Sequence, residues 1–557
     1  MTNGVNLSYV TTAFRRAVVA SLFVSSAVCV NACSATPDGA AAEQEDLAHT
    51  AQALATGFAV TTNRYDNGRS GTNLAETTLT TSNVNKNLFG LLFSRVVDGG
   101  IYAQPLYVGN LAIGGVAHNV VYVATQRDKV YAFDADAPTA TSALWSRDLG
   151  PAGPASDFSC TDMVDKVGIT STPVIDTSSG TMYLLAKVKQ GSTWSQHLHA
   201  LDISTGADRP GSPVTITASV PGTGAGSSHG MVSFDPKFNL NRAGLLLWGG
   251  NIYIGFASHC DEGAYHGWVL AYDARTLRQS LAFTPSPNGS KGGIWQGGVG
   301  LSADSSGIYV AAGNGSTNPN ASPRDLSEGV MRLGASDFSI KDFWVPSAFS
   351  SLNHSDADLS TGAILVPQHN LVVTGSKDGR LYVLNRSSLG GFNSQRDNII
   401  QTVITEGKSA GQRGHLHGGP IFYSVPSVGD VLYLWPEESR PAGYKMASSG
   451  TLGTPFHANV ATPGHPGGIL TLSANGSQAG SAILWASAPV GDAWHQTQPG
   501  ILYALNPVDL SVLWDTTQNA SRDGVGNFAK FTPPVVANGR VYMATFSGEL
   551  RVYGLLH

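Results

Sequence analysis

The chain has 557 residues, of which 65 are glycine and only 13% are charged, and its formal net charge is −6. A mildly acidic chain without a basic patch argues against nucleic-acid binding. Short runs of β-branched residues, interrupted by Gly, Asn, Asp and Pro, are typical of an all-β protein rather than a helical one.

Residues 1–33 are predicted to form a signal peptide. Arg15 and Arg16 precede an apolar run at residues 17–30 that is too short to span a bilayer. The sequence Val-Asn-Ala-Cys that ends at Cys33 resembles a lipobox, which would make Cys33 a lipidation site and membrane anchor, while ordinary signal cleavage nearby is the alternative. Residues 34–57 are rich in Ala, Glu and Gln and predict a disordered tether. We therefore expect an exported protein, in the periplasm, on the outer membrane as a lipoprotein, or outside the cell.

Residues 58–557 carry a repeated pattern of an apolar strand, a turn, a strand with a tyrosine, a polar loop and a strand ending in Asp or Asn. The copies occupy residues 120–134, 181–202, 251–273, 308–333, 371–385, 431–445, 483–506 and 541–553. The candidate inner strands before them are residues 104–108, 172–175, 231–234, 298–301, 363–366, 420–423, 468–471 and 534–536. Eight such units predict a single all-β domain, an eight-bladed β-propeller of four-stranded antiparallel blades.

The two ends of this domain are expected to meet. The last unit reaches the end of the chain at its third strand, while residues 91–97, ahead of the first inner strand, have no partner in their own blade. Residues 91–97 are therefore predicted to supply the outer strand of blade eight, which closes the ring without an exposed edge. Two separate β-sandwiches, the alternative, would leave this segment unpaired.

Cys160 and Cys260 are the two cysteines beyond the signal region. Both fall in loops of adjacent predicted blades, on the same face of the ring, so a disulfide is predicted for an exported protein. The alternative is a metal site in which His259 and Asp261 lie beside Cys260.

In a propeller, the loops that enter the inner strands and the loops between second and third strands emerge on one face. Much of the scarce charge and most of the histidines fall in these loops, which predicts a ligand-binding face. The candidate residues are Tyr102, Gln104, Arg127, Asp128, His229, His259, Asp261, His266, Trp295, Lys377, Asp378, His415, His417, Glu437, His465, His495 and Lys530.

His415 and His417 alternate on a segment predicted to be extended, so both rings would point to one side. His465, in the next entering loop, is a candidate third ligand for a metal ion. Hydrogen bonding along the pore, or recognition of a polar ligand, is the alternative interpretation.

Residues 200–206 (ALDISTG) resemble the strand-to-turn motif of quinoprotein alcohol dehydrogenases, and Trp145 and Trp514 stand where that superfamily has blade-docking tryptophans. Residues 101–105, 168–173 and 288–295 are similar to phrases shared by secreted bacterial PQQ-like repeat proteins. The resemblance implies an eight-bladed propeller and, in the dehydrogenases, PQQ with Ca²⁺ at the centre of the loop-rich face. The chain lacks their adjacent cysteine pair and a Cys-x-x-Cys-His haem motif.

These observations favour an exported, monomeric propeller that binds a polar small-molecule or carbohydrate ligand, with no reaction assigned. A PQQ- and Ca²⁺-dependent dehydrogenase acting on an alcohol or sugar is the first alternative. A carbohydrate lyase or hydrolase and an outer-membrane scaffold are the others, because a propeller fold by itself does not select among functions.

Overall fold

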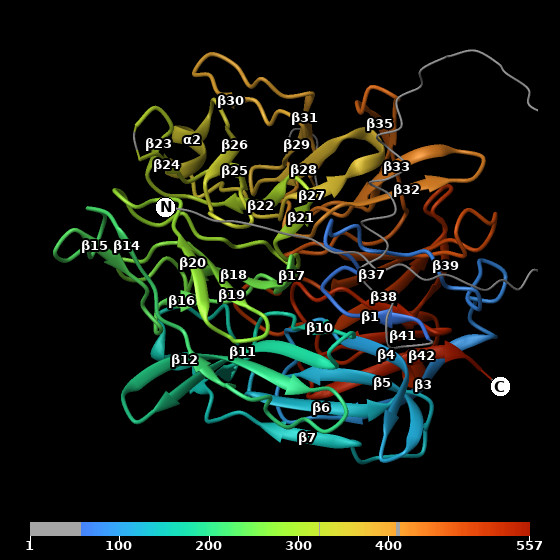
Figure 1. Cartoon of the computed structure of the whole chain (residues 1–557). Coiled ribbons are helices and arrows are strands. Elements are labelled where there is room, and N and C mark those ends of the chain that lie inside the picture. The colour runs from blue at the N-terminus through green and yellow to red at the C-terminus, as the bar shows by residue number, and fades with distance from the viewer. Residues whose placement is uncertain (1–56, 322, 408–412, 557) are drawn as a thin grey trace, which may run out of the picture.

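The computed structural model describes residues 57–321, 323–407 and 413–556, so the predicted signal peptide, Cys33 and the tether up to residue 56 lie outside the described residues. Eight antiparallel sheets follow one another around a common axis, and the strands nearest the two ends of the described chain lie beside each other (Figure 1). The predicted eight-bladed β-propeller is thus confirmed. No helix in the described ranges is long and apolar enough to cross a membrane.

The first four blades each contain four antiparallel strands, which follow one another from the axis outward. Blade 1 has β4 (Leu106–Ile113), β5 (Val116–Ala124), β6 (Lys129–Asp134) and β7 (Trp145–Asp148), and blade 2 has β10 (Val174–Asp176), β11 (Thr181–Gln190), β12 (Thr193–Asp202) and β13 (Val214–Thr215). Blade 3 has β17 (Leu246–Trp248), β18 (Asn251–Ser258), β19 (Trp268–Asp273) and β20 (Gln279–Phe283), and blade 4 has β21 (Ser302–Asp304), β22 (Gly307–Ala312), β25 (Gly329–Leu333) and β26 (Ile340–Val345).

The other four blades repeat this arrangement. Blade 5 has β27 (Ile364–Val366), β28 (Leu371–Gly375), β29 (Arg380–Asn385) and β31 (Gln401–Ile404), and blade 6 has β32 (Ile421–Val425), β33 (Gly429–Leu434), β34 (Ala442–Met446) and β35 (Leu452–His457). Blade 7 has β36 (Ile469–Ser473), β37 (Ile483–Pro489), β38 (Gly500–Leu505) and β39 (Val512–Asp515), and blade 8 has β40 (Val535–Ala537), β41 (Arg540–Ala544), β42 (Glu549–Leu555) and β3 (Phe89–Val96).

Short elements add to blade edges or decorate loops. They are β1 (Ala59–Val60) on β4, β2 (Thr72–Asn73) on β36, β16 (Asn239–Leu240) on β18 and β30 (Gly391–Phe392) on β26, together with the pairs β8 (Gly153–Pro154) with β9 (Lys166–Val167), β14 (Ser219–Pro221) with β15 (Met231–Ser233), and β23 (Thr317–Asn318) with β24 (Asp325–Leu326). The short helices are α2 (Phe349–His354), α3 (Ala520–Asp523), η2 (Ala155–Asp157), η3 (Pro367–His369) and η4 (Thr516–Asn519).

The ring closes as the sequence predicted. Strand β3 pairs antiparallel with β42, from Phe89 opposite Leu555 to Val96 opposite Glu549. Phe89 is fully buried, and its ring lies 4.9 Å from that of Trp514 in blade 7. Because the outer strand of blade 8 comes from the beginning of the propeller, the terminal blade gains a partner for its edge.

The predicted docking tryptophans join neighbouring blades. Trp145 of blade 1 donates a hydrogen bond to the carbonyl oxygen of Ile203, which follows β12 of blade 2, at 3.0 Å. Its ring covers Gly206, where a Cβ atom would come within 2.6 Å of the ring. Trp514 lies fully buried between blades 7 and 8. The apolar surfaces of adjacent sheets therefore cover each other around the ring.

Two predicted inner strands were wrong. Residues 231–234 do not form the inner strand of blade 3, because β15 pairs with β14 outside the blade and alternates exposed and buried side chains. The inner strand is β17, where Leu246 is fully buried, as an inner strand between neighbouring blades requires. In blade 4 the inner strand begins at Ser302 instead of at residue 298. Gly300, in the segment before it, lies against the side chain of Arg69 near the axis of the ring.

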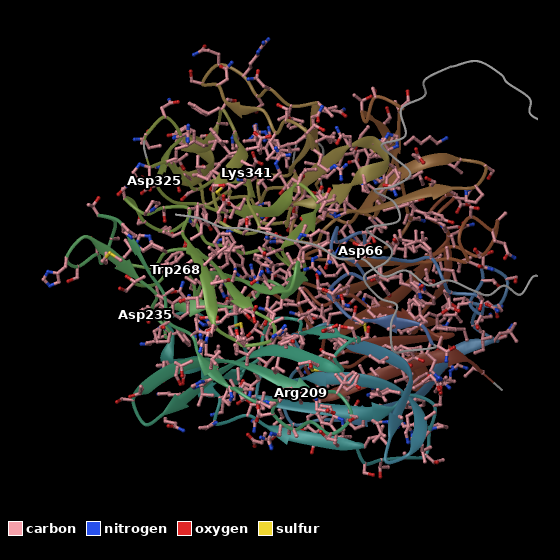
Figure 2. All side chains as sticks on the ribbon, in the orientation of Figure 1. Asp66, Arg209, Asp235, Trp268, Asp325 and Lys341 are labelled. Carbon is pink, nitrogen blue, oxygen red and sulfur yellow. A yellow bond between two sulfur atoms is a disulfide. The ribbon has the colours of Figure 1, made fainter. Side chains whose placement is uncertain are left out.

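A segment ahead of the first blade, residues 61–71, fills the central channel; we call it the plug. Figure 2 places Asp66, one of its residues, near the middle of the ring. Backbone carbonyls of the plug accept hydrogen bonds from the inner strands of four blades: Thr61 O from Ile175 N, Asn67 O from Ala303 N, Gly68 O from Leu365 N and Gly71 O from Leu472 N.

Side chains of the plug reach the other four blades. Arg64 binds the carbonyl oxygen of Pro420 in front of blade 6, Arg69 binds that of Leu245 in front of blade 3, and the hydroxyl of Tyr65 accepts a hydrogen bond from Val536 N in blade 8. Gln104, in front of blade 1, accepts a hydrogen bond from Arg64 N at 2.9 Å. Both arginines are almost fully buried. The plug therefore contacts every blade and closes the channel.

Candidate functional site

The alternating direction of the strands places two sets of loops on one face of the ring. These are the loops that lead into each inner strand and the loops between the second and third strands of each blade. Side chains from both sets touch each other above the plug, and we call this surface the central face. The opposite face carries the hairpins between first and second strands and between third and fourth strands.

A small cavity of about 20 Å³ lies near the axis on the central face. Its lining residues are Asn63, Tyr102, Thr170, Thr172, Arg242, Gly244, Gly298, Val299, Lys530 and Phe531. Asn63 belongs to the plug, so the plug forms part of the cavity wall. A cavity of this volume has room for about one water-sized group.

Two cations line this cavity; neither forms an ion pair among the described residues, although the charge of Asp162 acts on both from a longer distance. Within the described residues, Arg242 makes no ion pair; its Nε donates to the carbonyl oxygen of Trp295 at 3.3 Å, and its guanidinium lies 5.2 Å from the Trp295 ring and 4.6 Å from the Phe531 ring. Lys530 is 3% exposed, and its Nζ donates to the carbonyl oxygens of Asp162 at 2.5 Å and Trp494 at 2.7 Å. The guanidinium is thus held by one carbonyl oxygen and two aromatic rings, and the ammonium by two carbonyl oxygens.

Burial disfavours the charged forms of both Arg242 and Lys530. It lowers the pKa of Arg242 and lowers the pKa of Lys530 to about 8; the carboxylate of Asp162 opposes both shifts, while Arg242 adds to the shift of Lys530. The two positive charges repel each other, Asp162 offsets part of that repulsion, and a bound anion would offset more of it. Burial also raises the pKa of Tyr102, whose hydroxyl accepts a hydrogen bond from Val164 N at 3.3 Å.

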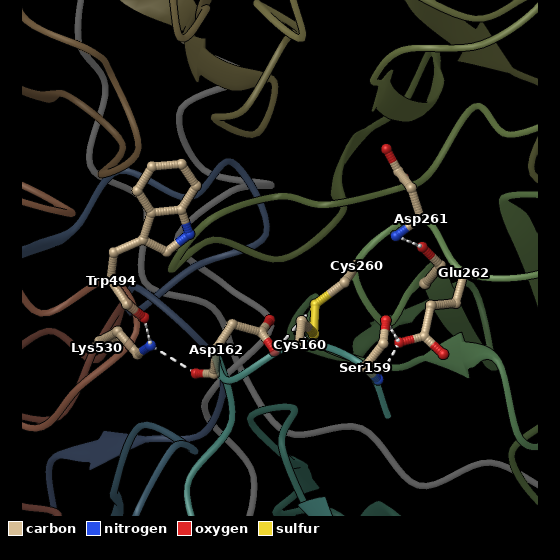
Figure 3. The surroundings of a disulfide bond; sticks show 9 residues. Ser159, Cys160, Asp162, Cys260, Asp261, Glu262, Trp494 and Lys530 are labelled. Atoms are coloured by element: carbon tan, nitrogen blue, oxygen red, sulfur yellow. Dashed lines mark hydrogen bonds between the residues drawn. A yellow bond between two sulfur atoms is a disulfide. The ribbon is translucent and has the colours of Figure 1, made fainter. Parts of the chain in front are cut away.

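The predicted disulfide forms between Cys160 and Cys260, with a Cα–Cα distance of 6.1 Å, within the usual range for disulfides. It joins the loop before blade 2 to a loop of blade 3, and it holds Asp162 beside the Lys530 ammonium, as Figure 3 shows. The alternative metal site at Cys260 is wrong, because its sulfur is bonded to Cys160 and is not a thiolate. The ring of His259 is instead buried against Phe158 and Lys187.

We expect removal of this disulfide by the double substitution Cys160→Ser and Cys260→Ser to destabilise the protein. The bond joins residues 100 positions apart, so its loss frees a long loop in the unfolded chain and lowers the free energy of unfolding by about 2–4 kcal/mol. Urea unfolding of the variant and the parent measures the difference. Equal midpoints would show that the loop contacts alone hold this region.

Acidic and basic side chains of blades 3 to 5 form a network beside the cavity. Lys377 pairs with Asp358 at 2.7 Å and with Asp356 at 3.2 Å, and Lys291 pairs with Asp261 at 3.3 Å. Asn314 donates to both Asp261 and Asp356. The predicted residues Lys377 and Asp261 therefore meet in one network, whose carboxylates already have ammonium partners.

Three predicted histidines converge on Glu437, a carboxylate in the loop between β33 and β34. His417 Nε2 lies 3.0 Å, His415 Nδ1 3.6 Å and His465 Nδ1 3.7 Å from Glu437 Oε2. Burial lowers the pKa of His417 to about 3 and lowers that of His465, while hydrogen bonds from both imidazoles lower the pKa of Glu437. The structure thus groups three imidazoles around one carboxylate.

Several other predicted site residues have structural roles. Gln104 binds the plug, and His266 is buried, with its ring nitrogens at the carbonyl oxygens of Ser286 and Ala225. Asp128 is fully buried in its turn, and burial raises its pKa.

The remaining predicted residues lie at the surface or the rim. Asp378 pairs with Arg380 at the start of β29, and His229 is exposed in the loop between β14 and β15. Arg127 pairs with Asp165 at 2.7 Å beside a surface groove of about 450 Å³ on blade 1. Exposed His495 stacks on Trp494 at 4.7 Å.

Sequence reasoning missed Arg242, Asp162, Phe531 and Glu328. Arg242 was missed because the inner strand of blade 3 was placed too early, so residues up to 245 were not counted as an entering loop. The fully buried run at Leu245 and Leu246 was the signal that could have moved the strand. Glu328 follows β24 and is fully buried, and burial together with Asp358 raises its pKa.

The cavity does not suit PQQ with Ca²⁺. A fused three-ring quinone is far larger than the 20 Å³ that the plug leaves at the axis. The disulfide joins cysteines 100 residues apart and does not form the ring of an adjacent pair. The nearby carboxylates that could supply hard oxygen ligands to calcium already contact Lys291 and Lys377.

Comparison with family models and with curated proteins finds no match. Solved structures do match, at low sequence identity. Quinohemoprotein alcohol dehydrogenase from Pseudomonas putida HK5 aligns with a TM-score of 0.54 and 14% identity, over 89% of this chain and 80% of that chain. Quinohemoprotein alcohol dehydrogenase from Comamonas testosteroni gives a TM-score of 0.51 and 13% identity over the same shares.

A europium-containing methanol dehydrogenase aligns with a TM-score of 0.54 and 13% identity, over 89% of this chain and 98% of that chain. At such identities the likeness extends to the fold and not to the site. The chain thus has the eight-bladed, quinoprotein-like β-propeller fold of these alcohol and methanol dehydrogenases.

Proposed function

We propose that this protein is an exported propeller that binds a small carboxylate-bearing ligand, of the sugar-acid class, on its central face. The observation that carries the proposal is the pair of cations, half-buried Arg242 and buried Lys530, which meet at one cavity without forming an ion pair among the described residues. The cavity of about 20 Å³ has room for one oxygen atom of a carboxylate, with the rest of the ligand lying on the face above it.

The surroundings of the cavity favour a sugar-like body for the ligand. Trp494 is 49% exposed at the rim, and its ring stacks on the ring of His465 at 5.7 Å. An exposed, supported aromatic ring gives a sugar ring an apolar surface to stack on. Arg242, whose guanidinium lies near the rings of Trp295 and Phe531, has the forked N–H donors that can bind a carboxylate with two hydrogen bonds.

Export is supported by the N-terminal sequence and by the disulfide. The apolar run at residues 17–30 after two arginines is typical of a secretory signal, and a structural disulfide suits an oxidising compartment. Anchoring through a lipid on Cys33 and a monomeric state belong to the same proposal.

The proposal is tested with the purified domain from residue 57 and a small ligand panel. Galacturonate, glucuronate and gluconate are compared with galactose, glucose and glucitol, and with PQQ plus Ca²⁺, by thermal unfolding and calorimetric titration. We expect acids alone to stabilise the fold, by about 2.7 kcal/mol at a concentration 100 times the Kd. Equal effects of acids and neutral sugars would refute the cation site, and PQQ binding with Ca²⁺-dependent dye reduction would favour a dehydrogenase instead.

Ligand affinity should fall as the pH rises above 8. Burial holds the pKa of Lys530 at about 8, with Arg242 acting as a neighbouring positive charge and Asp162 and Asp492 as negative ones. A bound anion favours protonated Lys530, so binding takes up a proton above pH 8, and the affinity falls by up to about tenfold per pH unit. Calorimetry between pH 7 and 10 measures this slope. The variant Lys530→Met should lose it, and a flat profile in the parent would contradict the role of Lys530.

A further inference from the structure

We propose that His415, His417, His465 and Glu437 form a binding site for a divalent transition-metal ion of the zinc class. The site adjoins the Arg242 and Lys530 cavity through Phe531, but its four donor side chains do not line that cavity, and the proposal does not depend on the proposed ligand. The four side chains come from three loops of two neighbouring blades, 6 and 7. Any one of these residues alone would be an ordinary hydrogen-bonding group.

Three of the four donors already have the spacing of a metal centre, and His465 lies outside this close group but approaches the same carboxylate oxygen. Ligand atoms of His415, His417 and Glu437 all lie within 4.8 Å of one another. Oε2 of Glu437 lies 3.0, 3.6 and 3.7 Å from one nitrogen each of His417, His415 and His465. With metal–ligand bonds of about 2.1 Å, the ligand atoms of a tetrahedral site are separated by about 3.4 Å. The observed separations are close to that value before any ion is added.

The chemistry of the donor set selects the class of ion. Three imidazole nitrogens and one carboxylate oxygen suit zinc and its first-row neighbours, whereas calcium and magnesium require mostly oxygen ligands. His417, His465 and Glu437 have side chains only 8%, 11% and 14% exposed, while His415 is 53% exposed at the outside. An ion can therefore reach the site from the central face past His415.

The loops that carry the ligands are fixed to each other by backbone contacts. Glu437 N donates to His415 O at 2.9 Å, and Glu438 N donates to Pro463 O at 2.7 Å. Gly414 lies close to the loop between β33 and β34. A Cβ atom on Gly414 would come within 2.7 Å of Glu437 O. Such contacts hold the side chains near their binding positions before the ion arrives.

Glu438 adds a strained backbone conformation beside the cluster. Its φ of 52° lies in the left-handed region, which is uncommon for a residue other than glycine and is frequent at binding sites. This residue directly follows Glu437, whose carboxylate lies beside the three imidazoles.

The test uses zinc alone as the probe. The purified protein is stripped with a chelator, dialysed and titrated with Zn²⁺, and metal bound per chain is measured by mass spectrometry. We expect one equivalent, and we expect Glu437→Gln and His415→Ala to weaken the affinity by about 100-fold or more. The matched control is His369→Ala, because His369 forms a similar pair with Asp430 at 2.7 Å on the opposite face. This control should bind zinc as the parent does.

The visible absorption of bound Co²⁺ gives a second measurement, which an unfolded variant cannot reproduce. Co²⁺ in a four-coordinate nitrogen and oxygen site absorbs visible light strongly. The parent and His369→Ala should therefore show this absorption band after Co²⁺ is added, while Glu437→Gln should not. His415 is exposed, so His415→Ala should keep the parent's unfolding curve and still lose zinc affinity. Zinc binding that is absent in the parent, or unchanged in both ligand variants, would overturn the proposal. Arg242→Ala should bind zinc normally, which separates this site from the proposed ligand cavity.

Discussion

Replacing Arg69 with alanine is expected to lower the free energy of unfolding by about 3–5 kcal/mol. The guanidinium of Arg69 is fully buried and donates to Leu301 O at 2.7 Å, to Asn63 O at 2.8 Å and to Leu245 O at 3.2 Å. Each of these carbonyl oxygens would be left in the interior without its donor, at a cost of about 1–3 kcal/mol each. The contacts join the plug to blades 3 and 4, so their loss also loosens the centre of the ring.

Thermal and urea unfolding measure this effect against Arg209→Ala. Arg209 pairs with Asp202 at 3.0 Å on the face opposite the cavity and donates to the carbonyl oxygens of Ser179 and Gly180, and a partly exposed arginine of this kind should contribute less than fully buried Arg69. Arg69→Lys should fall between the parent and Arg69→Ala, because lysine keeps the charge but not the forked donors. A loss smaller than that of Arg209→Ala would mean that the plug is held by its backbone alone.

The substitution Arg242→Ala is expected to weaken binding of a sugar acid by about 100-fold or more. Truncating one partner of a buried charged pair typically costs about 2–5 kcal/mol, and a tenfold change in affinity corresponds to about 1.4 kcal/mol. Arg242 forms no ion pair in the described structure, so the loss of affinity should be larger than the loss of stability that follows from its contacts with Trp295 and Phe531. Calorimetric titration and thermal unfolding of the same samples separate these two effects.

The control for this variant is Arg278→Ala, because Arg278 lies in the turn after β19 on the opposite face. Its affinity should equal that of the parent. If Arg242→Ala binds the acid as tightly as the parent does, then the carboxylate is not held at this cavity.

Ring closure was predictable because it follows from counting strands. Residues 91–97 are an apolar strand without a partner, and the last repeat lacks its fourth strand, so only one pairing removes both edges. Strand β3 indeed pairs with β42. The disulfide was predictable for a similar reason, since the strand order places Cys160 and Cys260 on the same face of adjacent blades.

The plug could not be predicted, because it has neither the alternation of a strand nor the period of a helix. Its hydrogen bonds join residues far apart in sequence, such as Tyr65 and Val536, which are 471 positions apart. In the sequence, Arg64 and Arg69 look like solvent-exposed loop charges, whereas in the structure both are buried by carbonyl oxygens of several blades. Tertiary contacts of this kind leave no local pattern.

The candidate site was predictable in part. Repeat spacing and strand direction identified the loops that carry His415, His417, Glu437, His465 and Lys530. They did not identify which of the loop side chains contact one another, because that depends on loop conformations. The predicted set lacks Arg242 because the inner strand of blade 3 was placed too early in the sequence. The loop that carries Arg242 was therefore not assigned to the central face.

The most direct test of the cation site is a crystal structure of the protein soaked in bromide, because this anion is located by its anomalous scattering. We expect a bromide ion in the cavity, between the guanidinium of Arg242 and the ammonium of Lys530. Tyr102 and Phe531 form part of the wall of this cavity. We also expect the same soak of Arg242→Ala to leave this position without bromide. A parent crystal with bromide only at surface cations, and water between Arg242 and Lys530, would contradict the proposed binding site.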